Sequence, residues 1–254
     1  MCPISHWYNA AGQLFAEVPN KSKPGQMRDF TLRDARAHPE TLYPSITTVM
    51  GVIEKPGLRD WQIEEAIRTA LQYGGDDVKF LASKADEKRR YAADYGTAIH
   101  NEICAQLGGS RSNRNLSFML APAIAQRVVQ WLHYEGYEIL ATEETIVNIV
   151  LGLAGTIDLR AMWKGKRVIV DFKSRDFTAG ETVQPYKEHG YQVAGYDQIL
   201  GGWAEERHIL YISRTDLLAD PQRVICGDPE RDDRIMLGLW DLWKLINKYG
   251  EVDG

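Results

Sequence analysis

The sequence predicts a mixed α/β domain with an N-terminal helical elaboration. Strand-like segments cluster after Glu138, whereas helix-period patterns dominate before it and separate the later strands. Over 254 residues, 44% are hydrophobic and 26% are charged, a composition typical of globular proteins. The expected order is helices, three strands, a helix, a strand and a last helix.

The N-terminal part is expected to be turn-rich up to about Pro44. Trp7-Tyr8-Asn9 and Leu14-Phe15 flank a glycine turn and predict a short hairpin. The Ser45 hydroxyl is suited to capping a helix start. A helix is expected over 58–71, with Trp61 as its core anchor.

Two longer helices should follow. Over 83–107, four residues recur every four positions: Tyr91, Tyr95, Ile99 and Ile103. The next helix should span 117–134 and place four residues on or near one side: Ile124, Val128, Trp131 and Leu132.

The second half carries the expected sheet. Strands are predicted over 145–150, 156–163, 166–174 and 208–213, with a helix over 186–200 before the last of them. Asp228-Pro229 should start the final helix. Its inward face is expected to hold Ile235, Leu239, Leu242, Trp243 and Ile246. We expect residues 1–82 to form the N-terminal hairpin and helical elaboration and 83–254 the core, within one compact domain overall.

Composition excludes several classes of protein. The sequence contains no run of about 18 uncharged apolar residues, so no membrane-spanning helix is predicted. The first residues also lack the pattern of a secretory signal. The net charge of −5 disfavours a protein that coats nucleic acid without selection. Three scattered cysteines (Cys2, Cys104 and Cys226) cannot form a four-cysteine zinc or iron–sulfur site. A cytoplasmic location fits best, with Cys104 as a buried filler.

Two acidic residues carry the first chemical signal. A symmetric turn at Lys164-Gly165 would place Asp158 directly opposite Asp171, with β-carbons about 4.5–5.5 Å apart. Like charges this close call for a cation or a shared proton. Without thiolates, the pair suits Mg²⁺ or Mn²⁺. Lys173 lies on the same face as Asp171 and would orient or deprotonate an attacking water. A salt-bridged strand with an incidental Asp opposite is the competing interpretation.

Two helical pairs add to this signal. Gly96 lies four residues before His100, and we expect the glycine to leave open space beside the imidazole, as a ligand site needs. Gln192 and Tyr196 share one face of a later helix. Taken alone, a single histidine beside a core face and a tyrosine on an amphipathic helix are more often structural.

Together these residues resemble the PD-(D/E)XK nuclease superfamily, in its RecB-like exonuclease branch. The four motifs occur in the branch's order, as Gly96 to His100, Gly155 to Asp158, Asp171 to Lys173, and Gln192 to Tyr196. The segments 43–49 and 55–58 also resemble phage-type and mitochondrial genome-maintenance exonucleases. The resemblance implies a restriction-endonuclease-like core, a mixed central sheet flanked by helices.

The resemblance also implies roles for these residues. His100, Asp158, Asp171 and the backbone carbonyl of Phe172 would bind the metal, and Lys173 would be the catalytic lysine. Gln192 and Tyr196 would support the site or contact DNA. The implied activity is a metal-dependent DNA exonuclease in recombination, repair or replication, leaving a 5′-phosphate and a 3′-hydroxyl.

Two other functions stay open at this stage. One is a structure- or site-specific endonuclease on the same core, and the other is a catalytically inactive DNA-binding module. The expected partner is DNA with a free end, single- or double-stranded, together with an annealing or single-strand-binding protein; RNA is not excluded. The chain would work in the cytoplasm, of a host cell if it is phage-encoded, with no membrane partner.

Two basic clusters offer candidate phosphate contacts. One lies around the expected strand hairpin and comprises Lys164, Lys166, Arg167 and Arg175, and the other is the segment from Lys84 to Arg90. Ordinary solvated surface is the alternative for both. Glu143 and Glu144 lie at the edge of a strand and are expected to be solvated. The alternative is that one of them adds an outer carboxylate to the metal site.

Overall fold

The computed structural model describes residues 6–38, 41–109 and 118–250, and its centre is a five-stranded mixed sheet. The strand order is β10-β9-β8-β7-β6, with only β8 and β9 parallel. The strands are β6 (Tyr137–Asn148), β7 (Leu153–Trp163), β8 (Lys166–Arg175), β9 (Glu206–Ser213) and β10 (Gln222–Ile225). The predicted mixed α/β class is confirmed, and β10 is a strand that the sequence did not predict.

The turn between β7 and β8 has the predicted length and symmetry. Lys164 (φ 50°) and Gly165 (φ 79°) both adopt positive φ, as a two-residue type I′ hairpin turn requires. Trp163 therefore pairs with Lys166, and the same register continues to Leu159 opposite Val170. The predicted register is confirmed up to the position just before Asp158 and Asp171.

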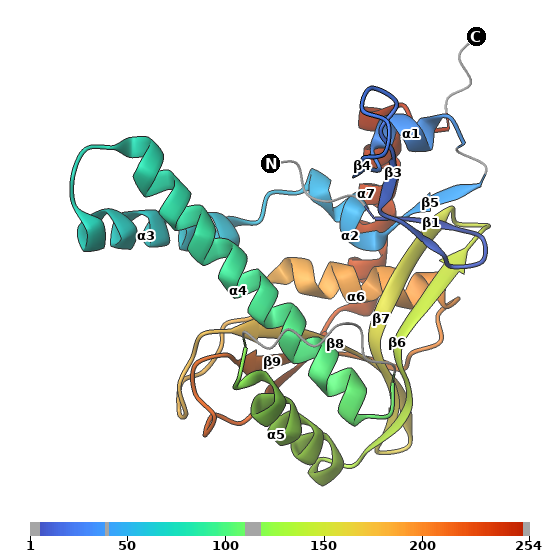
Figure 1. The fold of residues 1–254 in the computed structure, drawn as a ribbon. Helices are drawn as coiled ribbons and strands as arrows, with labels where there is room; N and C mark the ends of the chain where they lie inside the picture. Colours follow the sequence, from blue (N-terminus) through green and yellow to red (C-terminus); the bar gives the residue numbers. More distant parts are fainter. Residues whose placement is uncertain (1–5, 39–40, 110–117, 251–254) are drawn as a thin grey trace.

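Helices cover both faces of the sheet (Figure 1). The helices α4 (Val78–Gln106) and α5 (Ala121–Tyr134) share a core with Leu159 and Val170 on one face. The helices α6 (Lys187–Ile199) and α7 (Pro229–Asn247) pack with Ile169 and Tyr211 on the other. The parallel pair β8–β9 is joined through α6, the crossover that a parallel connection requires.

The N-terminal part contains more strand than the sequence predicted. The strand β1 (Trp7–Asn9) pairs with β2 (Leu14–Phe15), which confirms the hairpin, and also with β5 (Leu42–Pro44). The Ser45 hydroxyl accepts a hydrogen bond from the Thr48 amide and caps α2 (Ile46–Val49) as expected. The remaining short elements are β3 (Glu17–Pro19), β4 (Met27–Asp29), α1 (Leu32–Arg36) and the 3-10 turn η1 (Met50–Val52).

The helix α3 (Pro56–Tyr73) and the first half of α4 extend away from the sheet (Figure 1). Thr69 is the only buried residue of α3, so the expectation that Trp61 anchors a core is wrong. Trp61 is half-buried and lines a pocket instead. Asp77 caps α4, which therefore starts five residues before the predicted Ser83.

The buried faces of two helices differ from the predicted ones. In α4, Ile99 and Ile103 are fully buried, whereas Tyr91 is 57% exposed because it lies on the projecting half. In α7, Leu242 and Ile246 are exposed. The buried residues of α7 include Met236, Leu239, Trp240 and Trp243, a stripe rotated from the predicted one.

Two predictions fall outside the described residues: the position of Cys2 and the start of the helix at Ser117. Within the described part of the chain, no helix combines the length and the apolar character needed to cross a membrane. The larger core cluster joins Trp7, Ile46 and Val49 with Trp240 and Trp243, so both ends of the chain contribute to it.

Candidate active site

The central feature of the site is a separation of two strands. Backbone pairing between β7 and β8 is last recorded at Leu159 and Val170, whereas β8 continues to pair with β9 as far as Arg175. Beyond that point the Asp158 carboxylate enters the gap and accepts a hydrogen bond of 2.7 Å from the Phe172 amide. The predicted pair of acids is therefore brought together where the two strands diverge.

Asp171 is buried, and Asp158 beside it is largely withdrawn from solvent. The side chain of Asp171 is 2% exposed and that of Asp158 is 14% exposed. Burial is the main cause that raises the pKa of Asp171 to about 6, and the neighbouring Asp158 raises it further. The pKa of Asp158 is also raised, chiefly by burial. Burial therefore disfavours the charged form of each carboxylate.

Lys173 neutralises one of these charges. Its ammonium lies 2.5 Å from Asp171 Oδ2, and its side chain keeps 21% exposure. The alternation of β8 places Asp171 and Lys173 on one face, as the sequence predicted, while Val168, Val170 and Phe172 enter the core on the other. The lysine is thus held beside the acid pair with access to solvent.

His100 reaches the same point from α4. Its Nδ1 atom lies 3.7 Å from Asp158 Oδ2, and its ring packs edge-on against Phe172 with centroids 5.8 Å apart. Burial, followed by the charge of Lys173, lowers the pKa of His100 to about 4. The imidazole is therefore neutral at physiological pH, which is the state that binds metals.

Glu143 is a site residue that the sequence analysis did not favour. One ligand atom from each of His100, Glu143 and Asp158 lies within 4.8 Å of the others. The register shift in β6 between Ile139 and Ala141 and the positive φ of Glu143 (49°) set this part of the strand opposite Asp158. Partial burial by the surrounding chain, followed by the charge of Asp158, raises the pKa of Glu143 to about 7. Glu143 nevertheless keeps contact with solvent, at the outer side of the acid pair.

Glu144 has a different role from its neighbour. Its carboxylate forms an ion pair with the Arg160 guanidinium, so it is engaged on the surface of the sheet. No sequence signal separates the two glutamates, because the irregularity in β6 that decides their directions depends on strand pairing.

Gln192 and Tyr196 support the acid pair from α6. Gln192 Nε2 donates to Asp171 Oδ1 at 3.2 Å and to the Tyr196 hydroxyl at 2.8 Å. Tyr196 is only 5% exposed and belongs to the larger core cluster. Of the two roles considered for this pair, the contacts favour positioning of Asp171.

Two glycines of the motifs allow close packing. A Cβ at Gly155 would lie 2.9 Å from the Tyr196 ring, so this glycine lets α6 approach β7. A Cβ at Gly96 would lie 2.5 Å from Ser174 Oγ. The expectation that Gly96 leaves open space beside the imidazole is therefore wrong, because the space is filled by Ser174 of β8.

The basic cluster at the β7–β8 turn lies far from the site. Lys164 is six residues beyond Asp158, about 20 Å along a strand. Lys166 and Arg167 form ion pairs with Glu206 and Glu205. Arg175, at the other end of β8, is the one member of this cluster close to the site.

The second cluster, from Lys84 to Arg90, is also engaged in ion pairs. Lys84 pairs with Glu87 and Lys88 with Glu65. The Asp86 carboxylate forms ion pairs with Arg89 and Arg90, the two arginines of the segment. Most of this cluster is thus ordinary paired surface, as the alternative interpretation held. Cys104 is buried, as expected.

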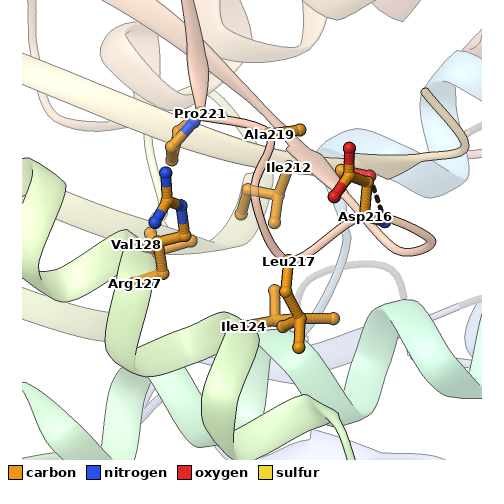
Figure 2. Close-up of a pocket in the computed structure, with 9 residues that line it drawn as sticks. Ile124, Arg127, Val128, Ile212, Asp216, Leu217, Ala219 and Pro221 are labelled. Carbon is orange, nitrogen blue, oxygen red and sulfur yellow. Dashed lines mark hydrogen bonds between the residues drawn. The ribbon is translucent and has the colours of Figure 1, made fainter. Parts of the chain in front are cut away.

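The loop after β9 covers a small hollow away from the acid pair (Figure 2). Arg127 of α5 holds this loop by donating to the Leu218 carbonyl and pairing with Asp220. The volume of the hollow is about 10 Å³, which leaves room for one water molecule at most. It is therefore no site for a substrate.

Comparisons with known proteins leave the family open. No family model matches the chain, and no characterised protein matches its sequence. Among solved structures, SSO0001 matches with a TM-score of 0.28 and 12% identity, over 74% of this chain and 86% of that one. A TM-score this low does not establish a shared fold.

Proposed function

We propose that the chain is a divalent-metal-dependent DNA exonuclease with a PD-(D/E)XK core of the RecB-like type. The observation that carries this proposal is the convergence of Asp158, Asp171, Lys173 and His100 at the point where β7 and β8 separate. The four residues come from three elements and lie in the order and on the elements that the sequence motifs require.

The donor set fits a hard divalent cation. It offers oxygen ligands from the carboxylates of Asp158, Asp171 and the exposed Glu143, and a nitrogen ligand from the neutral imidazole of His100. No thiolate is among these ligands. Burial raises the pKa of both aspartates even though Lys173 opposes the shift, so a cation bound here would stabilise their ionised forms. We therefore propose that His100, Asp158, Asp171 and the Phe172 carbonyl hold Mg²⁺ or Mn²⁺, with Glu143 as an additional ligand.

A bound cation of this kind polarises a phosphodiester and lowers the pKa of a bound water. The residues of the chain do the rest. Lys173 faces the acid pair and keeps partial solvent access, so its ammonium orients the attacking water and balances the negative charge that develops on the phosphate. Gln192 fixes the orientation of Asp171 through its hydrogen bond. In-line attack of water on the phosphorus, with breakage of the bond to the 3′ oxygen, would leave a 5′-phosphate and release that oxygen as a 3′-hydroxyl.

End-labelled linear DNA, single- and double-stranded, tests this proposal against a closed circle of the same sequence. Each substrate is incubated with Mg²⁺, Mn²⁺ or EDTA, beside a Lys173→Ala variant. We expect degradation of linear DNA that requires metal and is lost in the variant. Cutting of the circle would identify an endonuclease, and metal-independent binding without cleavage would identify a binding module.

A further inference from the structure

A pocket of about 490 Å³ opens beside the candidate active site. It lies between the start of α3, the middle of α4 and the end of β8, and its volume is typical of small-molecule sites. Lys173 is the one residue of its lining that also belongs to the proposed metal and catalytic set. Its cationic lining consists of Lys55, Arg89, Lys173, Arg175 and Arg214.

Lys55 and Arg175 are the two cations of this pocket that form no ion pair within the described part of the chain. Arg89 pairs with Asp86, and Arg214 pairs with Asp176. Lys55 has no ion pair among the described residues. Burial and the charge of Lys173 lower the pKa of Lys55, against a smaller opposing effect of Glu188. Two ammonium groups that repel each other across a half-buried space are stabilised by an anion between them.

The arrangement around Lys55 is fixed by close packing. The Arg175 guanidinium stacks on the Tyr186 ring at 4.5 Å and donates to the Gln184 carbonyl. A Cβ at Gly57 would lie 2.4 Å from the same ring, so the first turn of α3 rests directly on Tyr186. Lys55 precedes this turn of α3, and both Lys55 and Arg175 line the pocket.

Trp61 supplies an aromatic surface in the same pocket. It lies on α3, close in sequence to Lys55, and its side chain is half-buried against the pocket. Aromatic side chains stack on nucleic-acid bases without regard to sequence, because every base presents a π-face. The pocket thus offers cations that can bind a phosphate and an aromatic ring on which a base can stack. A ligand with both groups is a nucleotide.

We propose that this pocket holds the nucleotide adjoining the scissile phosphate, with its phosphate on Lys55 and Arg175 and its base on Trp61. The inference rests on the proposed nuclease function and extends it to substrate choice. A base that stacks on Trp61 has left its duplex partner, so the pocket favours a single-stranded or unpaired substrate.

Calorimetric titration with thymidine 5′-monophosphate, and with thymidine, tests the pocket without any cleavage. The wild-type chain should bind the nucleotide and not the nucleoside. Loss of a charged hydrogen bond should weaken nucleotide binding about tenfold or more in Lys55→Ala. Lys55→Arg should restore most of it, and Lys79→Ala, at an exposed position of α4, should change nothing. Nucleotide affinity unchanged in Lys55→Ala would overturn the inference.

Cleavage of single-stranded and duplex DNA by the same variants separates this inference from the nuclease proposal. Lys55→Ala and Trp61→Ala should raise KM for single-stranded DNA while Mn²⁺ affinity stays at the wild-type value. An active nuclease whose KM is unaffected by both changes would overturn the pocket assignment alone. Nucleotide binding that depends on Lys55, in a chain that cleaves no DNA, would overturn the nuclease proposal.

Discussion

The Asp158 carboxylate accepts a 2.7 Å hydrogen bond from the Phe172 backbone amide, across the gap where β7 leaves β8. In a regular hairpin that amide would face a backbone carbonyl of the partner strand. Here a side chain takes its place, which fixes the carboxylate beside Asp171 and His100.

Replacing Asp158 by Asn should separate charge from structure. The amide oxygen of Asn still accepts from Phe172, so the thermal midpoint should stay the same or rise once a buried charge is removed. Mn²⁺ affinity and DNA cleavage should both fall, by at least about 10-fold for affinity. Calorimetry and a melting curve check both effects. Asp241→Asn, on the exposed surface of α7, is the control, and equal metal affinity in the two variants would contradict the ligand role.

Lys173 variants test its part in the chemistry. Removing a group that assists proton transfer and charge balance should lower the cleavage rate by about 10²–10⁴-fold. Lys173→Ala should bind Mn²⁺ nearly as well as the wild type, because the lysine is not a ligand. Single-turnover cleavage measures the rate, with Lys164→Ala as the matched control at the far turn. A rate within a few-fold of the control would exclude a catalytic role.

Glu143 and Glu144 form a natural pair of test and control. Glu143→Gln should weaken Mn²⁺ binding, because its carboxylate lies with those of the metal cluster. Glu144→Gln breaks the ion pair with Arg160 and should leave metal binding unchanged. Titration with Mn²⁺ compares the two variants. The opposite ranking would remove Glu143 from the site.

Stability should depend on pH through Asp171. Its pKa is raised from 3.8 to about 6 in the folded chain. Between these values the folded state keeps a proton that the unfolded state has released, so stability falls as pH rises from about 4 to 6. Melting curves of the metal-free chain should show this fall, and Asp171→Asn should reduce it. Added Mg²⁺ should raise the midpoint more at pH 8 than at pH 5, because metal binding needs the ionised carboxylate.

The sequence predicted the strand register that leads up to the site, as far as Leu159 opposite Val170, better than the surroundings of the site. Lys164-Gly165 prescribes a two-residue turn, and turn length alone determines which residues of β7 and β8 face each other. The position of Glu143 depends on an irregularity between β6 and β7, which is a property of the paired strands rather than of either segment.

Packing choices explain the other errors. In α7 two apolar stripes are present, and tertiary contacts bury the one with Met236 and Trp240 while Leu242 stays exposed. Trp61 follows a core-like pattern, yet α3 leaves the sheet, so its ring faces a pocket. For Gly96, the sequence shows a missing side chain but not that Ser174 fills the space.

Pulsed electron paramagnetic resonance of the chain loaded with Mn²⁺ tests the central claim most directly, because it detects nitrogen bound to the metal. One imidazole nitrogen should couple to the bound Mn²⁺, and the coupling should vanish in His100→Ala but persist in His133→Ala. The wild-type sample should degrade linear DNA under the same conditions. A spectrum without nitrogen coupling, or one unchanged in His100→Ala, would contradict a metal centre built from His100 and the two aspartates.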